Sequence, residues 1–381
     1  MPVKVLHIIT KLEFGGAQRN TIYTAAHLDK KLFDAKLIAG PGGALDGEVP
    51  PGSIAYVSRL IRRISPVDDF LAVLELRNVI RNEAPLIVHT HSSKAGILGR
   101  LAARLAGVPV IIHTFHGFGF HERQHPLLKR FFILLEKLCS LFSDALVFVS
   151  NANMNYARDY GLCEQGECVL IRSGIRLGDY PARSDRAAKR RELGVPEDAV
   201  LIVSLGNLKP QKNPGDFIAA ARRLSGAHPN AVFMLVGGGE NLEAARLQAA
   251  EAGLARRLLF PGWRMDSAEI LAAADIFALT SLWEGLPRSL VEAVRTGLPS
   301  VCYKTDGVAD LLYDGANGYA VAPGDLDAFC LRLKELIEQP ALRAEMSARA
   351  AGTDLAEFDI DYMVRQQEAL YLKLLKKKRI D

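Results

Sequence analysis

Short runs of hydrophobic residues alternate along this chain with longer stretches that follow a helical spacing. Each run has the length of a strand and is hydrophobic on both faces, as in a strand covered from both sides. Strands that alternate with helices in this way form a parallel sheet between two layers of helices. The first half of the chain therefore predicts a doubly wound α/β domain. Its predicted strands are residues 3–10, 86–90, 109–115 and 145–149, and its clearest helix is 94–106.

A break in this alternation separates two halves of the chain. Residues 178–196 include Pro181, Arg183, Ser184 and Asp185, followed by a basic run, and they show no strand pattern. We therefore predict a linker there. The alternation then resumes and predicts a second doubly wound domain. Its predicted strands are residues 200–205, 232–236, 258–260, 276–279 and 299–302.

These boundaries predict an N-terminal Rossmann-like domain over residues 1–177 and a C-terminal Rossmann-like domain over residues 197–357. Residues 360–378 follow a long helical pattern with a basic end, and we expect the helix at 358–381 to pack back on the first domain. In open parallel sheets, ligands bind at the carboxyl ends of the strands. Two such domains that face each other would form a cleft, so residues that follow predicted strands are the candidates for its chemistry.

Composition excludes several classes of protein. Hydrophobic residues make up 49% and charged residues 24% of the 381 residues, which is typical of a globular chain. A net charge of +4 is too small to indicate nucleic-acid binding. No run reaches the roughly 18 hydrophobic residues of a membrane span, and no signal-peptide pattern is visible, so we expect a cytoplasmic protein. Five cysteines favour ordinary thiols in a reducing compartment over a disulfide framework.

A loop with two lysines follows the first predicted strand of the second half. Residues 206–212 carry Lys209 and Lys212, and two ammonium groups at the carboxyl end of a strand can neutralise a diphosphate. A solvated turn would have the same composition, but the position in the predicted sheet favours a phosphate site. A glycine-rich stretch at 237–240 lacks the spacing of the dinucleotide fingerprint, which argues against a dehydrogenase.

The strongest local signal is the stretch 284–292, which follows another predicted strand. Pro287 suits the first position of a helix, where its missing N–H costs nothing. The backbone N–H groups of the next turn would then point at an anion. These groups belong to Arg288, Ser289 and Leu290. Glu284 and Glu292 suit sugar hydroxyls, because carboxylates are strong hydrogen-bond acceptors; the alternative is a capped helix with glutamates on its surface.

Candidate residues in the first half lie after two strands. Gly15 and Gly16 precede a helix and would let a phosphate approach its N-terminus, although a tight turn explains them equally well. His116 is nearest the carboxyl end of strand 109–115, on the face opposite to His113. Its imidazole can donate to a substrate oxygen near neutral pH, but a strand-end histidine with a purely structural role is the commoner case.

Histidine and cysteine spacings do not predict a metal site. His89 and His91 lie two residues apart after another strand, but no third ligand at a metal spacing is evident, so a structural role is expected. Cys163 and Cys168 have no metal spacing and no matching second pair. We therefore predict that neither a metal nor a cofactor takes part.

Taken together, these motifs resemble those of the retaining glycosyltransferases of family 4. The resemblance covers nearly the whole chain and implies the GT-B architecture, in which two Rossmann-like domains face each other across a cleft. The motifs are, in order, the glycine loop 15–19, the HTxHG stretch 113–117, the segment 171–175 before the linker, the phosphate-binding loop 206–212, the E-x7-E pair Glu284 and Glu292, and the turn Asn317-Gly318.

The resemblance implies an enzyme that moves a hexosyl group from a nucleoside-diphosphate sugar, with UDP as the expected nucleotide. The acceptor would be a hydroxyl of a glycan or lipid-linked molecule in lipopolysaccharide, capsule or exopolysaccharide synthesis. The implied catalytic residues are His116, Glu284 and Lys212. The implied donor-binding residues are Gly15, Gly16, Asn207, Lys209, Lys212, Arg264, Leu286, Arg288, Ser289, Leu290 and Glu292.

A few positions depart from the family pattern. Asn207 stands where many members have an arginine, and Lys209 would supply the missing charge. Pro287 and Arg288 replace a glycine and a hydrophobic residue, and Asp310 stands where a glutamate is common. These differences bear on the choice of sugar rather than on the general activity.

Two other functions and a membrane contact fit the same sequence. A nucleotide-sugar epimerase shares the two-domain architecture and needs no acceptor, and a non-catalytic scaffold would only bind sugar nucleotides. The basic amphipathic segment 121–142 and the basic tail 376–379 suit anionic lipid at the inner face of the cytoplasmic membrane. A core helix and a solvated tail are their alternative interpretations.

Overall fold

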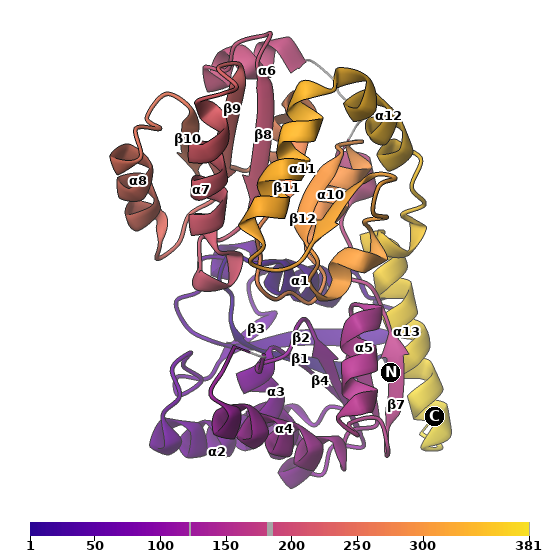
Figure 1. The fold of residues 1–381 in the computed structure, drawn as a ribbon. Coiled ribbons are helices and arrows are strands. Elements are labelled where there is room, and N and C mark those ends of the chain that lie inside the picture. Colours follow the sequence, from indigo (N-terminus) through magenta and orange to yellow (C-terminus); the bar gives the residue numbers. More distant parts are fainter. Residues whose placement is uncertain (122, 181–185, 381) are drawn as a thin grey trace. The chain divides into compact units, whose positions relative to one another are not determined.

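The computed structural model describes residues 1–121, 123–180 and 186–380. Residues 181–185, in the predicted linker, lie outside the described residues. The chain forms two compact units (Figure 1). Unit 1 consists of Met1–Gly174 and Asp359–Asp381, and unit 2 consists of Ile175–Phe358.

Unit 1 is built on a seven-stranded sheet in which each pair of neighbours is parallel. The strand order is β3 (Ile54–Tyr56), β2 (Phe33–Gly40), β1 (Val3–Lys11), β4 (Ile87–His91), β5 (Val110–Phe115), β6 (Ala145–Phe148) and β7 (Glu167–Leu170). Every residue of β4 and β5 is buried, as the hydrophobic runs predict for strands covered on both faces. The helices are α1 (Gly16–His27), α2 (Pro66–Glu83), α3 (Ser93–Ala106), α4 (Pro126–Ser140), α5 (Asn151–Asp159) and α13 (Ile360–Lys377).

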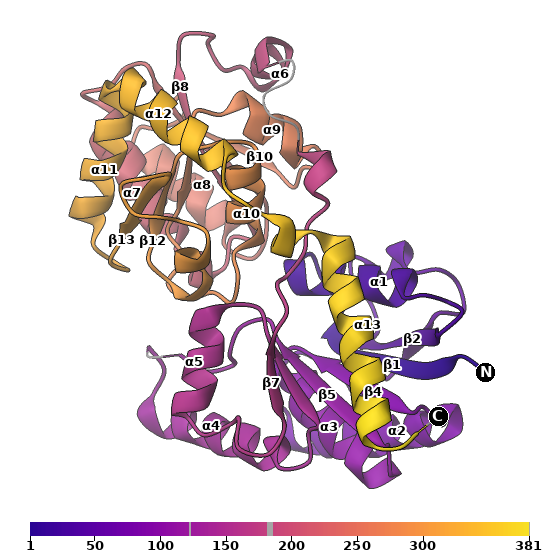
Figure 2. The same ribbon diagram turned by 90° about the vertical axis from the view of Figure 1, so that its right-hand side faces the viewer.

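The C-terminal helix α13 belongs to unit 1 and runs alongside its sheet (Figure 2). Tyr371 of this helix is buried in one hydrophobic cluster with Val5 of β1. The basic end of the helix is tied down by ion pairs. Lys373 Nζ lies 2.5 Å from Glu167 Oε2, and Lys378 Nζ lies 2.7 Å from a carboxylate oxygen of Asp144. Part of the basic tail therefore neutralises acidic residues of unit 1.

Unit 2 has a six-stranded sheet, and its neighbouring strands are again parallel. The order is β10 (Leu258–Gly262), β9 (Ala231–Val236), β8 (Val200–Leu205), β11 (Ile276–Leu279), β12 (Ser300–Tyr303) and β13 (Gly318–Val321). The helices are α6 (Arg186–Leu193), α7 (Pro214–Ser225), α8 (Leu242–Glu251), α9 (Ser267–Ala273), α10 (Arg288–Arg295), α11 (Leu326–Glu338) and α12 (Pro340–Ala351). Both units are thus α/β and doubly wound, as predicted.

The second half of the predicted linker is folded into unit 2. Arg190, on α6, is 1% exposed. Its guanidinium donates to the carboxylate of Asp275 and to the carbonyl oxygens of Ala273, at 3.0 Å, and Ala199, at 2.8 Å. The prediction that this basic run is a linker is therefore wrong. The Asp275 carboxylate and the two backbone carbonyls hold Arg190 inside unit 2.

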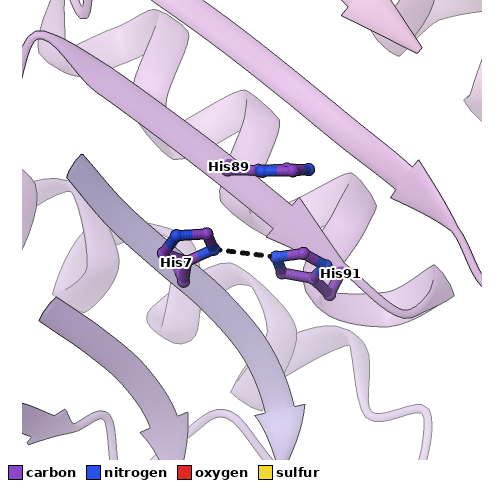
Figure 3. Close-up of side chains that lie close together, drawn as sticks. All are labelled: His7, His89 and His91. Atoms are coloured by element: carbon purple, nitrogen blue, oxygen red, sulfur yellow. Dashed lines mark hydrogen bonds between the residues drawn. The ribbon is translucent and has the colours of Figure 1, made fainter. Parts of the chain in front are cut away.

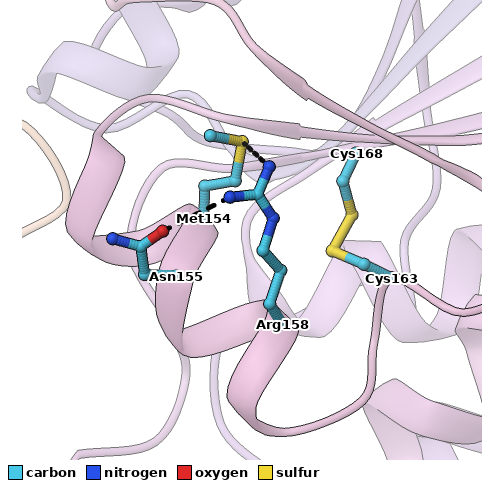
Figure 4. Close-up of a disulfide and its surroundings, with 5 residues drawn as sticks. All are labelled: Met154, Asn155, Arg158, Cys163 and Cys168. Atoms are coloured by element: carbon cyan, nitrogen blue, oxygen red, sulfur yellow. Dashed lines mark hydrogen bonds between the residues drawn. A yellow bond between two sulfur atoms is a disulfide. The ribbon is translucent and has the colours of Figure 1, made fainter.

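A disulfide joins Cys163, in the loop after α5, to Cys168 on β7 (Figure 4). Their Cα atoms are 5.7 Å apart, within the usual range for a disulfide. Cys139, Cys302 and Cys330 are free and buried. The expectation that all five cysteines are ordinary thiols is therefore wrong for this pair, since the loop between them turns back on itself.

Candidate functional site

Lys212 and Glu284 are the centre of the candidate site in unit 2. Lys212 ends the 3₁₀ turn η3 (Pro210–Lys212) after β8, and Glu284 lies in the loop after β11. Because β8 and β11 are parallel neighbours, both loops leave the same edge of the sheet. The ammonium group of Lys212 donates to the carboxylate of Glu284, which is 8% exposed. The structure thus brings together two of the three residues predicted to be catalytic.

Further hydrogen bonds hold these two loops against each other. Thr280 Oγ1 donates to the carbonyl oxygen of Lys212 at 3.1 Å. Gln211 Nε2 donates to the carbonyl oxygen of Trp283 at 2.8 Å. The N–H of Leu282 donates to the carbonyl oxygen of Gln211, also at 2.8 Å. The ion pair therefore rests on loops whose backbones are mutually bonded, which restricts the positions of both charged groups.

The loop after β8 also packs against the glycine-rich loop after β9. Gly237 has a φ of 137°, and a Cβ atom there would lie 1.9 Å from the carbonyl oxygen of Gly206, so only glycine fits. A Cβ atom on Gly239 would lie 2.1 Å from Oδ1 of Asn207. The N–H of Lys209 donates to the carbonyl oxygen of Asn207 at 2.8 Å. Gly237 and Gly239 do not belong to a dinucleotide fingerprint. Their presence is explained by the close packing of the two loops.

Helix α10 begins one residue later than predicted. Pro287 is its N-cap, with φ −73° and ψ 97°, and Arg288 is its first residue. The N–H of Leu290 donates to the carbonyl oxygen of Pro287 at 2.9 Å, so the prediction that it points at an anion is wrong. The N–H of Ser289 lies in the first turn, where a helix supplies no acceptor of its own. Leu286, just before the helix, is 7% exposed.

Two predicted donor-binding side chains have protein partners. Glu292, on the second turn of α10, is hydrogen-bonded to the phenol of Tyr180, and burial followed by this carboxylate raises the pKa of Tyr180. Arg264 Nε donates to Asp266 at 2.7 Å, and its guanidinium also donates to Glu192 of α6. These two carboxylates raise the pKa of Arg264. Whether either residue also binds the donor stays a prediction.

Asp306 is part of this site, and the sequence analysis missed it. It begins the 3₁₀ turn η4 (Asp306–Asp310) after β12. Its Oδ2 accepts from the N–H of Glu284 at 2.9 Å, and the N–H of Gly307 donates to the carbonyl oxygen of Gly285 at 3.0 Å. Burial, followed by the Glu284 carboxylate, raises the pKa of Asp306 to about 6. The other site residues were predicted because they follow strands. Asp306 follows β12 in the same way, so the same criterion could have found it.

The predicted glycine loop of unit 1 opens helix α1. Gly15 is the N-cap and Gly16 the first helical residue, and the first turn carries no acidic side chain. A Cβ atom on Gly15 would lie 2.4 Å from Oε1 of Gln18. The N-terminus of this helix suits an anion electrostatically, but its role in phosphate binding stays a prediction.

His7 on β1 and His89 and His91 on β4 lie close together in unit 1 (Figure 3), and His116 follows β5. His7 on β1 is the register partner of His89 on β4. His7 Nδ1 lies 3.0 Å from His91 Nε2, and His91 Nδ1 lies 3.2 Å from His116 Nε2. The sequence analysis missed His7, because a single histidine inside a hydrophobic strand has no spacing signal; the register of two distant strands places it here.

The two faces of β5 are divided as the alternation predicts. The His113 ring packs against Phe115, with ring centroids 4.4 Å apart. Thr114 Oγ1 lies 2.7 Å from His89 Nε2, and His116 reaches the same side of the sheet. His116 therefore contacts His91 of the neighbouring strand, while His113 faces the other way.

The hydrogen bonds of His7, His89 and His91 test whether these residues fit a metal ion. One nitrogen of each lies within 4.8 Å of the others, close enough for shared coordination. However, both nitrogens of His89 are engaged, by Tyr371 at 2.6 Å and Thr114 at 2.7 Å. The rings of His7 and His91 are only 17° from parallel and their bonded nitrogens face each other, so their lone pairs do not converge on one point. The geometry favours hydrogen-bonded imidazoles.

Two family models match the two halves of this chain. The model described as Glycosyltransferase Family 4 matches residues 14–178, and the model described as Glycosyl transferases group 1 matches residues 185–353. The matches therefore extend over both Rossmann-like units and include His89, His91 and His116 of unit 1 and the Lys212–Glu284 pair of unit 2.

Curated relatives match along most of the chain. The UDP-Gal:alpha-D-GlcNAc-diphosphoundecaprenol alpha-1,3-galactosyltransferase of Escherichia coli is 32% identical over 378 residues, which covers 98% of this chain and 97% of that protein. The N,N'-diacetylbacillosaminyl-diphospho-undecaprenol alpha-1,3-N-acetylgalactosaminyltransferase of Campylobacter jejuni is 27% identical over 79% of this chain and 80% of that protein.

Solved structures share the fold. HepE of Anabaena, in complex with UDP-glucose, has a TM-score of 0.80 and 23% identity, and the match covers 97% of this chain and 99% of that chain. Sucrose-phosphate synthase from Thermosynechococcus elongatus has a TM-score of 0.83 and 18% identity, and the match covers 98% of this chain and 100% of that chain. These likenesses support the GT-B fold that the sequence predicts. The family models and the E. coli relative show that the chain belongs to the family 4 glycosyltransferases.

Proposed function

We propose that this glycosyltransferase moves a sugar from a UDP-sugar to a hydroxyl group of a lipid-linked glycan, with retention at the anomeric carbon. The E. coli relative is named for a UDP-galactose donor, and both curated relatives are named for diphosphoundecaprenol-linked acceptors. HepE was solved with UDP-glucose. The observation that carries the proposal is the pair formed by Lys212 and Glu284. It sets a cation suited to a diphosphate beside a buried acceptor suited to sugar hydroxyls.

In this proposal, the bond between the anomeric carbon and the diphosphate breaks while the acceptor oxygen bonds to the same carbon. The proton of the acceptor hydroxyl passes to the leaving diphosphate. Lys212 and the first-turn N–H groups of α10 stabilise the negative charge that grows there. Glu284 accepts from the transferred sugar, Glu292 from the ribose, and His116 of unit 1 donates to the donor sugar. We also propose that these cationic and N–H groups make the transfer independent of a metal ion.

We further propose that α4 rests on an anionic membrane surface. Glu136 on this helix is buried against Arg100, to which it is ion-paired, and so fixes which side of α4 faces the protein. Arg130 and Lys137 are exposed. The exposed stripe consists of Leu127 at 67%, Phe131 at 53%, Leu134 at 54% and Leu138 at 49%. A hydrophobic stripe flanked by basic residues suits anionic lipid, and its exposure argues against the alternative of a core helix.

Among the described residues, no helix combines the length and hydrophobicity that a bilayer crossing requires. The proposed membrane contact is therefore of the kind in which a helix lies on the surface.

The proposed reaction is tested with the purified full chain, UDP-galactose or another UDP-sugar, and synthetic GlcNAc-diphosphoundecaprenol, with and without EDTA. The expected products are UDP and an elongated lipid whose new bond has the donor's anomeric configuration, in equal amounts in both conditions. An altered UDP-sugar formed without acceptor would indicate an epimerase. Binding without turnover would indicate a scaffold, and loss of activity in EDTA would contradict metal independence.

A further inference from the structure

Asp306 completes a row of charged side chains along the carboxyl edge of the sheet in unit 2. The strands β8, β11 and β12 are neighbours in that order, and they are followed by Lys212, Glu284 and Asp306 respectively. The row therefore has one positive end, at Lys212, and one negative end, at the two carboxylates. The proposed function uses Lys212 for the diphosphate and Glu284 for the transferred sugar, but it gives Asp306 no role.

The loops that carry Glu284 and Asp306 are in direct contact. Asp306 Oδ2 accepts from the N–H of Glu284 at 2.9 Å, and the N–H of Gly307 donates to the carbonyl oxygen of Gly285 at 3.0 Å. A Cβ atom on Gly307 would lie 2.5 Å from that carbonyl oxygen, so a larger residue there would push the loops apart. Asp306 is thus held beside Glu284.

One oxygen of each carboxylate is left for a ligand. Lys212 donates to Glu284 Oε1, and the N–H of Glu284 donates to Asp306 Oδ2. Among the described residues, Glu284 Oε2 and Asp306 Oδ1 have no hydrogen-bond partner. Asp306 is partly exposed, so a ligand can reach it. Ionised carboxylate oxygens only accept hydrogen bonds, and two such acceptors side by side suit the hydroxyl groups of a sugar.

Two features of Asp306 are unfavourable for the fold. Its φ is 28°, in the left-handed region that residues with a side chain rarely adopt. Burial, followed by the Glu284 carboxylate, raises the pKa of Asp306 to about 6, so the folded protein disfavours the ionised form. Strain and a destabilised charge at one residue are typical of a functional site.

We propose that Asp306 determines sugar specificity: it accepts from a hydroxyl group of the donor sugar and excludes sugars that carry a carboxylate. Lys212 balances Glu284, so without Asp306 the row would be neutral. With Asp306 ionised, a uronic acid would bring a further negative charge to the negative end of the row. A hexose ring is smaller than the Debye length, about 8 Å at about 0.15 M salt, so repulsion reaches a carboxylate on any ring carbon.

This inference rests on the proposed function and names the substrate class of the same site, the uncharged sugars. It is tested by isothermal titration of the full chain with UDP, UDP-galactose and UDP-galacturonate at pH 7.5. The two sugar nucleotides differ only at carbon 6, which is a hydroxymethyl group in one and a carboxylate in the other. We expect the wild type to bind UDP-galacturonate at least about tenfold more weakly than UDP-galactose. Equal affinities would overturn the inference.

Two substitutions separate direct recognition from the positioning of Glu284. Asp306→Asn keeps an oxygen for the N–H of Glu284 and tolerates the positive φ, but its amide replaces a negative acceptor with a neutral donor. We expect its affinity for UDP-galacturonate to rise by about tenfold. Its affinity for UDP-galactose should fall by about threefold or less, because a sugar hydroxyl can also accept. Asp306→Gly removes the side chain without backbone strain and should also bind UDP-galacturonate more tightly than the wild type.

A gain of affinity for one ligand cannot arise from general damage to the fold. Asp327→Asn makes the same change of net charge at a side chain that is 89% exposed on α11, and it should leave all three affinities unchanged. If Asp306→Asn binds UDP-galacturonate no better than the wild type does, Asp306 only positions Glu284 and the inference is wrong.

The outcomes for specificity and for transfer are independent. If the affinities change as expected but no sugar is transferred from any UDP-sugar, the proposed function fails while the specificity stands. If sugar is transferred but the affinities do not depend on Asp306, the inference fails while the proposed function stands.

Discussion

The ammonium group of Lys212 donates to the carboxylate of Glu284, which lies 72 residues later in the chain. The side chain of Glu284 is 7% exposed and that of Lys212 is 23% exposed. A carboxylate buried to this extent requires a cation or several donors, because its removal from water is otherwise unfavourable. Lys212 therefore balances the charge of Glu284. In the proposed function, it also presents a positive charge to the diphosphate of the donor.

Replacing Lys212 separates diphosphate binding from nucleoside binding. Lys212→Ala removes the cation, so we expect the affinity for UDP to fall by about 10- to 100-fold, as for the loss of one charged hydrogen bond. The affinity for uridine should change little. Isothermal titration with both ligands measures the difference. Lys334→Ala, on the exposed side of α11, is the control, and an equal loss for UDP and uridine would place the role of Lys212 elsewhere.

The raised pKa of Asp306 predicts that the free energy of unfolding changes between about pH 4 and pH 6. Its folded pKa is raised to about 6, above the value of about 3.9 for an unfolded aspartate. The folded state therefore binds the proton more tightly, and the ionised carboxylate destabilises it at neutral pH. This penalty is largest above about pH 6 and disappears as the pH falls towards about 4.

Asp306→Asn removes this charge but keeps an oxygen that can accept from the N–H of Glu284. We expect it to raise the melting temperature at pH 7.5 and to leave it nearly unchanged at pH 4.5, measured by calorimetry. Asp327→Asn, at an exposed aspartate on α11, should show no such difference. The same shift at both pH values would mean that the charge of Asp306 is not the cause.

Arg190 is expected to be essential for the stability of unit 2. Arg190→Leu leaves the buried carboxylate of Asp275 without this partner, and losing one member of a buried ion pair typically costs about 3–5 kcal/mol. Denaturant unfolding measures the loss. Arg191→Leu, at an exposed arginine on the same helix, is the matched control. Similar midpoints for the two variants would contradict the role of Arg190.

The proposed binding of α4 to a membrane would have a hydrophobic and an electrostatic part. Phe131→Ser with Leu134→Ser should abolish sedimentation with vesicles of phosphatidylcholine and phosphatidylglycerol. Arg130→Gln with Lys137→Gln should weaken it by about 10- to 30-fold, at about 1 kcal/mol for each basic residue. Leu331→Ser, an exposed leucine on α11 of unit 2, is the control. Equal binding to vesicles of phosphatidylcholine alone would contradict the electrostatic part.

The sequence predicts the strands of this fold best where both of their faces are hydrophobic. The bounds of β8 and β11 agree with their hydrophobic runs. In contrast, β2 (Phe33–Gly40) was not predicted, because Asp34 and Lys36 interrupt its hydrophobic pattern. Arg190 was assigned to a linker for a related reason: its burial depends on Asp275, which is distant in sequence.

The candidate site was predictable in position but not in its contacts. Lys212 and Glu284 were found because each follows a strand, but their pairing depends on β8 and β11 being neighbours in the sheet. The approach of His7 to His91 likewise depends on the pairing of β1 with β4. The disulfide of Cys163 was missed because spacing alone does not show how a loop turns. Such contacts are set by tertiary structure rather than by local pattern.

The central claim is that Glu284 acts on the transferred sugar while Lys212 and α10 hold the nucleotide. The most direct test compares wild type with Glu284→Ala in two measurements, the rate of transfer from UDP-galactose to GlcNAc-diphosphoundecaprenol and the affinity for UDP. We expect transfer to fall by about 100- to 1000-fold, the usual effect of losing one preorganised electrostatic contact to a transition state, while the affinity for UDP stays nearly unchanged. Wild-type transfer by Glu284→Ala, or a loss of UDP affinity equal to the loss of transfer, would contradict the account.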